Sequence, residues 1–245
     1  MQTFFTQFFL LYITQFSLTV GVFFVYGFLL FAIQQKIHTI YFKTIGWKGI
    51  LLTAWIGTPV HELSHAIFAW MFGHKIHKIS FFSPNKETQR LGYVTHSYEK
   101  WSIVQRFGSF FIGGAPLIVG PLVILSLLYW LQPQLYSLIH TFDLSLILQS
   151  IKDPLFWIFM YIAFSISSHM APSLQDMSGM KQGLGILLIA FFISSLIGMI
   201  FSISFYTMYT SLLSIIYSLS FVYIFAFVIS VVHLFVAMLV GMVKR

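Results

Sequence analysis

Long, predominantly apolar stretches dominate this chain, and about 20 such residues are what an α-helix needs to cross a lipid bilayer. The 245 residues are 58% hydrophobic and only 8% charged. A soluble protein carries about 25% charged residues, so this chain has too few to cover a water-facing surface. The pattern predicts an all-α polytopic membrane protein. It excludes an ordinary cytosolic enzyme, a disordered regulator and a nucleic-acid-binding domain.

Six segments have the length and composition of a membrane span. Their expected ranges are 8–33, 50–72, 107–131, 154–169, 184–206 and 212–240. The fourth is short and runs into Pro172, which predicts an unwound end, tolerated at membrane depth only where protein or water covers it. No basic residue precedes the first segment and no cleavage-like site closes it, so we expect it to be retained. Without repeats or low-complexity linkers, residues 1–245 are expected to form a single membrane domain.

One segment, between Ile76 and Tyr98, has strand character. Residues 76–81 partly alternate between apolar and polar, residues 83–86 are typical of a turn, and residues 91–95 are rich in strand formers. The sequence therefore predicts a small β-hairpin between the second and third spans, on the cytoplasmic face. A polar loop is the alternative.

The basic residues indicate how the chain is oriented. There are 13 Lys and Arg against 6 Asp and Glu, a formal charge of +7. With six spans, one face collects nine of the basic residues: Lys75, Lys78, Lys86, Arg90, Lys100, Arg106, Lys181, Lys244 and Arg245. The other face has four: Lys36, Lys43, Lys48 and Lys152. Because basic residues are enriched in cytoplasmic loops, both termini are expected to be cytoplasmic.

The chemistry concentrates in an H-E-x-x-H motif, formed by His61, Glu62 and His65 within the second span. Residues i and i+4 share one face of a helix, so both imidazoles can reach one Zn²⁺ while the adjacent glutamate acts as general base on a water. Ionisable groups inside a span are costly and usually functional. The alternative is a purely structural cluster of polar side chains between helices, in which every hydrogen-bonding group has a partner. The chain contains no cysteine, so a metal must be held by histidine and carboxylate.

Three stretches resemble the site-2 protease family of intramembrane zinc metallopeptidases. Residues 58–66 (TPVHELSHA) are similar to the zinc helix of that family. Residues 113–121 (GGAPLIVGP) resemble its third core helix, and residues 169–176 (HMAPSLQD) resemble its segment ending in a metal-binding aspartate. The resemblance implies a metallopeptidase core over about 50–182, with Glu62 catalytic and zinc held by His61, His65 and Asp176.

His169 is the competing third ligand, seven positions before Asp176. A lone carboxylate at membrane depth is expensive unless a cation is bound, whereas a neutral histidine needs only a hydrogen bond. Asp176 also occupies the place of the ligand in the resembled family. We therefore expect Asp176 to bind the metal, and His169 and Pro172 to support it or the substrate.

The leading hypothesis is a zinc-dependent intramembrane endopeptidase that cleaves a transmembrane or membrane-proximal segment of a protein. The alternative is a non-proteolytic zinc-binding scaffold, or a partner subunit of another membrane protein. A metal transporter is less favoured, because transporter sites often lie between repeated halves. The expected setting is the cytoplasmic membrane of a prokaryote, with the lipid bilayer and a membrane protein as partners and no nucleic acid.

Overall fold

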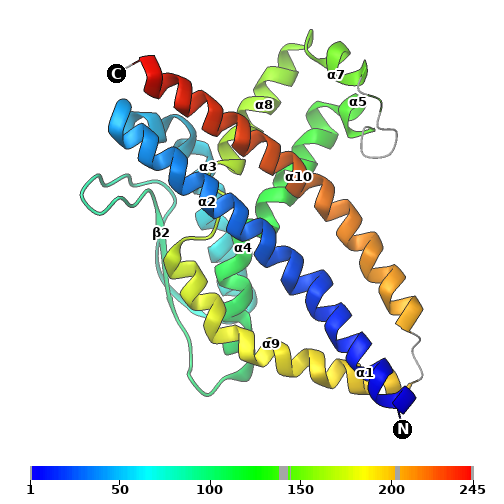
Figure 1. Ribbon diagram of the computed structural model, residues 1–245. Helices are drawn as coiled ribbons and strands as arrows, with labels where there is room; N and C mark the ends of the chain where they lie inside the picture. Colours follow the sequence, from blue (N-terminus) through cyan, green and yellow to red (C-terminus); the bar gives the residue numbers. More distant parts are fainter. Residues whose placement is uncertain (1, 138–142, 144, 202–204, 244–245) are drawn as a thin grey trace.

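The computed structural model describes residues 2–137, 143, 145–201 and 205–243. The fold is mostly helical, with one two-stranded sheet (Figure 1). The helical elements are α1 (Gln2–Gln15), the π-helical η1 (Phe16–Gly21), α2 (Val22–Thr44), α3 (Trp47–Met71), α4 (Ile103–Leu131), α5 (Pro133–Tyr136), α7 (Ser145–Ser150), α8 (Pro154–Ser167), α9 (Leu174–Ile200) and α10 (Phe205–Val243). The strands are β1 (Lys75–Ser80) and β2 (Tyr93–Ser97).

Four helical segments in the described ranges are long and apolar enough to cross a membrane: Phe4–Thr44, Ile103–Leu131, Leu174–Ile200 and Ser220–Val243. This agrees with a membrane protein, but six spans are not confirmed. Helix α8 has only 14 residues, and α3, which carries the polar motif, is not one of the four. The expected fifth span includes residues 202–204, which lie outside the described residues.

The first helical region is longer than the sequence predicts. Helices α1 and α2 join through η1, and α2 continues to Thr44 instead of ending near residue 33. Lys36 and Lys43 are therefore helical and not in a connecting loop. The cause is that an α-helix satisfies its own backbone hydrogen bonds, so it can extend past the apolar stretch that a hydropathy argument detects.

The predicted hairpin is confirmed. Strands β1 and β2 pair antiparallel from Lys75–Ser97 to Ser80–Tyr93, with a bulge between Ile76 and Lys78. The hairpin lies along α3 (Figure 1). Leu91, just before β2, packs on a cluster that includes Ile50 and Ala54 of α3. The far end of the hairpin therefore rests against the N-terminal half of α3. The near end, where β1 begins, directly follows the C-terminal end of that helix.

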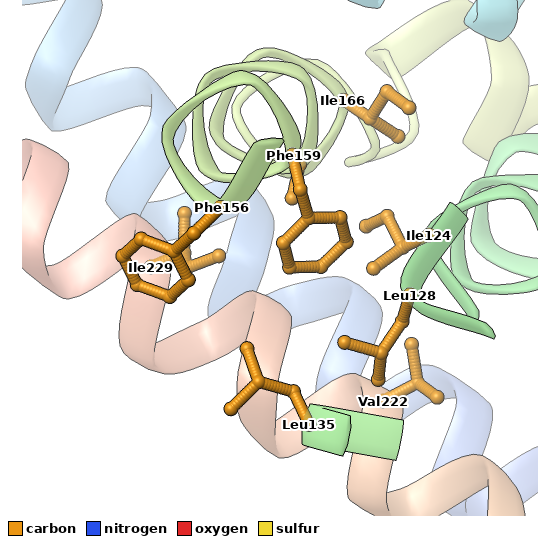
Figure 2. Close-up of a cluster of buried hydrophobic side chains, with 9 residues drawn as sticks. Ile124, Leu128, Leu135, Phe156, Phe159, Ile166, Val222 and Ile229 are labelled. Atoms are coloured by element: carbon orange, nitrogen blue, oxygen red, sulfur yellow. The ribbon is translucent and has the colours of Figure 1, made fainter. Parts of the chain in front are cut away.

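A buried apolar cluster joins α4, α5, α8 and α10 (Figure 2). At its centre Phe159 of α8 is fully buried, and Ile124 of α4 is 1% exposed. Val222 and Ile229 bring α10 to the same cluster. This packing fixes the end of α8, where the chain leaves the helix and crosses through residues 168–173 to the start of α9.

Candidate metal centre

Helix α3 presents His61 and His65 on one face, one turn apart. Their Nε2 atoms lie 3.0 Å from each other, and the ring centroids lie 4.7 Å apart. His65 is buried, at 6% exposure. The i, i+4 spacing of the motif therefore does what the sequence predicts, since it points two imidazole nitrogens at one place.

Two main-chain carbonyls set the orientation of these rings. His61 Nδ1 donates to the carbonyl oxygen of His169 at 2.7 Å, and His65 Nδ1 donates to the carbonyl oxygen of Ile112 at 2.7 Å. A neutral imidazole has one N–H, so in the neutral form of both rings Nε2 carries a lone pair. This is the arrangement of metal-binding histidines, whose second nitrogen usually donates to a carbonyl or carboxylate.

Asp176 completes the group from the first turn of α9. Its carboxylate oxygens lie 3.5 Å from His61 Nε2 and 3.4 Å from His65 Nε2. Asp176 also belongs to a capping box, because Oδ2 accepts from the Ser173 amide at 2.7 Å and Ser173 Oγ accepts from the Asp176 amide. The cap holds the carboxylate in one orientation, and the helix N-terminus favours its negative charge.

The three groups fit a tetrahedral metal ion. Their ligand atoms all lie within 4.8 Å of one another. With metal–ligand bonds of 2.0–2.1 Å, neighbouring ligand atoms of a tetrahedron lie about 3.3 Å apart, and the observed separations are 3.0, 3.4 and 3.5 Å. When both rings are neutral, two lone pairs and a carboxylate face one another, and a cation between them stabilises this arrangement. The donor set therefore suits a cation, and three ligands leave a fourth position open.

Glu62 lies next to this group and is almost buried, at 8% exposure. The hairpin approaches it at Gly92, where an added Cβ would lie 2.8 Å from Glu62 Cγ and 2.8 Å from the Ser80 carbonyl oxygen. Only glycine lets the hairpin backbone come so close. A carboxylate in this position can exchange a proton with a water held at the metal site.

The structure gives His169 a different place from Asp176. The His169 ring bonds Thr53, with 2.9 Å between Nε2 and Oγ1, and only its main-chain carbonyl reaches His61. Pro172 lies in the irregular segment between α8 and α9, and its side chain has no ligand atom. Among the predicted residues, the structure thus brings together His61, His65 and Asp176, with Glu62 beside them.

Some residues at the site lie outside the sequence prediction. The Ile112 carbonyl and the close approach of Gly92 leave no side-chain signal in the sequence. The S-x-x-D pattern of Ser173 and Asp176 is readable as a capping box, and it would have predicted the start of α9 and the orientation of the carboxylate.

A second histidine pair lies outside the helices, where the hairpin meets α4. His74 Nε2 donates to the Gln105 carbonyl oxygen at 2.8 Å, so His74 Nδ1 accepts from His96 Nδ1 at 3.0 Å. Burial, reinforced by the neighbouring His74, lowers the pKa of His96 to about 4. Burial also lowers the pKa of His74. Both rings are therefore neutral at pH 7.

No protein-family model, no curated protein and no solved structure matches this chain. The chemistry of the site is therefore the basis on which a function can be assigned.

Proposed function

We propose that this chain is an intramembrane zinc metallopeptidase, in which His61, His65 and Asp176 hold Zn²⁺ and Glu62 is the general base. One observation carries the proposal. Two imidazole Nε2 atoms and a carboxylate converge at 3.0–3.5 Å, with a second carboxylate beside them, in a protein that has four helices long and apolar enough to cross a membrane.

The ligand set favours zinc in a catalytic role. Nitrogen and oxygen ligands without thiolate suit Zn²⁺, and three protein ligands with an open position are typical of catalytic zinc sites, whereas structural sites have four. When bound, zinc supplies Lewis acidity and lowers the pKa of a water to about 7. When His61 and His65 are neutral, each Nδ1 donates to a main-chain carbonyl, which leaves Nε2 free to bind the metal.

Glu62 performs the proton transfers of peptide hydrolysis. Its carboxylate takes a proton from water as the water oxygen bonds to the carbonyl carbon of the substrate. It then delivers that proton to the amide nitrogen as the C–N bond breaks, so the products are a carboxylate and an amine. Glu62 is nearly buried, so there is little competing bulk water at the carboxylate.

The hairpin gives the proposal a substrate class. A helical substrate hides its amides in its own hydrogen bonds, so the segment to be cleaved must be extended. A two-stranded sheet has free edges, and an extended segment can add to one of them by main-chain hydrogen bonds. Because Gly92 lies against Glu62, a segment paired with this hairpin would lie near the metal site. We propose a transmembrane or membrane-proximal segment of a protein as substrate.

The proposed setting follows from the expectations of the sequence. We place the protein in the cytoplasmic membrane of a prokaryote, with both termini in the cytoplasm. Orientation can be measured by fusing reporter domains to the termini, independently of activity.

The test is a tethered single-span reporter, compared between the wild type and Glu62→Gln in purified, zinc-loaded protein. Gln is nearly isosteric with Glu and cannot accept the proton from water, so we expect zinc to stay bound at about 1:1 and cleavage to be lost. Cleavage by Glu62→Gln at the wild-type rate would refute the role of Glu62. Zinc binding without cleavage of any reporter by the wild type would favour the alternative, a zinc-binding scaffold or partner subunit.

A further inference from the structure

A buried chain of hydrogen bonds links the last helix to the end of α8. His233 of α10 is 3% exposed. Its Nε2 lies 2.9 Å from the hydroxyl of Tyr41 in α2, and its Nδ1 lies 2.6 Å from Ser168 Oγ. Three segments far apart in the sequence thus meet at one imidazole.

The direction of these bonds is fixed by their surroundings. The Ser168 hydroxyl donates to the Phe164 carbonyl oxygen at 2.7 Å, so Ser168 Oγ accepts from His233 Nδ1. His233 Nε2 then accepts from the Tyr41 hydroxyl. Every polar atom of the neutral imidazole is satisfied, which is what a polar group buried among apolar helices requires.

Ser168 directly precedes the residue that orients the metal ligand His61. Helix α8 ends at Ser167, and the His169 amide makes a last bond, to the Ile166 carbonyl oxygen. The chain then runs irregularly to Ser173. The His169 carbonyl is therefore not fixed within a helix, and it is the acceptor for His61 Nδ1.

Met170 and Ala171 pack in a buried apolar cluster, and two side-chain hydrogen bonds hold the start of this segment. One is the bond from the His169 ring to Thr53 of α3, and the other is the bond from Ser168 to His233. Helix α10 is itself fixed on α8, since Ile229, one turn before His233, belongs to the apolar cluster with Phe156 and Phe159 (Figure 2). His233 thus connects a rigidly packed helix to a segment that has no regular structure.

We propose that His233 is a positioning residue for the metal site: through Ser168 it fixes the His169 carbonyl that orients His61. This rests on the metal site proposed above. Outer partners of metal ligands contribute about 10–100-fold to metal affinity. His233 does not contact a ligand directly and acts through Ser168 and the His169 carbonyl. We therefore expect an effect on zinc affinity near the lower end of that range, about tenfold.

Three variants of position 233 separate this role from simple packing. In His233→Asn the amide nitrogen reaches about as far as Nδ1 and can still donate to Ser168. In His233→Gln the amide reaches about as far as Nε2 and keeps only the Tyr41 contact. His233→Leu removes both. The matched control is Ser230→Ala. It also removes a buried polar side chain from α10, but the Ser230 hydroxyl donates to the Ala226 carbonyl oxygen of the same helix and not to residues 168–173.

The experiment measures zinc affinity of the purified full-length protein by competition with a chromophoric chelator, and thermal stability in parallel. We expect affinity to fall about tenfold in His233→Gln and His233→Leu, and to stay near wild type in His233→Asn and Ser230→Ala. Ser168→Ala should cause a similar loss, and adding it to His233→Gln should cost little more, because residues in one network are not additive.

The outcomes are distinguishable. If the wild type binds zinc and His233→Gln binds it as tightly as His233→Asn does, His233 has no positioning role, although the metal site stands. If affinity follows thermal stability across all the variants, including Ser230→Ala, the effect is packing and the inference is wrong. If the wild type binds no zinc, the metal site and this inference both fall. Should His233→Leu not fold, the comparison of Asn with Gln still decides.

Discussion

The carbonyl oxygen of Asp176 lies directly against Gly113, where the first turn of α9 meets the middle of α4. A side chain at position 113 would overlap that oxygen and would lie 2.7 Å from Met180 Cγ. The preceding residue of α4, Ile112, provides the carbonyl that accepts from His65. Two consecutive residues of α4 therefore set the position of one proposed ligand and the orientation of another.

Gly113→Ala should weaken zinc binding by moving Asp176 away from the two histidines. The methyl group meets main-chain atoms that cannot rotate aside, and overpacking of this kind costs about 1–3 kcal/mol of stability. If relaxation of this strain moves Asp176, and the same free energy is lost from binding, affinity falls by roughly 5- to 100-fold. Chelator competition measures it. The control is Gly185→Ala in α9, where an added Cβ meets nothing within 4 Å. Equal zinc affinity in both variants would contradict the proposed geometry.

Asp176→Asn should reduce zinc affinity by more than about 100-fold, because even outer partners of the ligands contribute 10–100-fold. His169→Asn keeps the main-chain carbonyl that accepts from His61, so zinc should remain bound within about tenfold of wild type. Metal analysis after dialysis distinguishes the two. Zinc retained by Asp176→Asn and lost from His169→Asn would reverse the assignment of the third ligand.

Gly92→Ala should reduce cleavage without removing zinc. The new methyl group would clash with the Ser80 main chain and with Glu62, so the hairpin must move outward. A displacement of about 1 Å at a reacting group costs on the order of 100-fold in rate. Reporter cleavage and zinc content are measured on the same preparation. Unchanged cleavage in a folded Gly92→Ala protein would show that the hairpin does not position the substrate.

The attachment of the hairpin to α4 should weaken as the pH falls below about 6.5. Above that value His96 is neutral in both the folded and the unfolded chain. Between pH 6.5 and about 4 the unfolded chain takes up a proton that the folded hairpin does not, because the pKa of His96 is lowered to about 4, so stability falls with falling pH. Limited proteolysis at neutral pH and at about pH 5 follows this change. In His96→Asn, whose amide still donates to His74 but does not titrate, the pH dependence should be smaller.

The sequence allowed the histidines and Glu62 to be located together because their spacing is local. Positions 61, 62 and 65 lie within one turn and a half of any helix, so their mutual geometry does not depend on the rest of the fold. The hairpin was also predictable, because its alternation and its turn lie within one short segment. By contrast, His61 and the carbonyl that orients it are 108 positions apart, and a main-chain carbonyl has no residue type by which to recognise it.

The number of spans was less predictable than the positions of the helices. Hydropathy locates apolar stretches, but α2 extends into residues 34–44 by satisfying its own backbone, and α8 has only 14 residues. His38, which lies between the expected first and second spans, is part of α2. Hydropathy alone therefore does not give the lengths of these two helices.

The Asp176 carboxylate takes part both in the capping box at the start of α9 and in the proposed metal site. The Asp176 carboxylate uses one oxygen to hold the Ser173 amide and leaves the other beside His65. An ion that fixes the orientation of this carboxylate also stabilises the capping hydrogen bond at the start of α9, a helix of 27 residues. The distant part of α9 packs on α1, where Phe192 contacts Phe8. If a metal binds as proposed, the exchange rate of the Ser173 amide hydrogen should therefore report how much of the protein carries it.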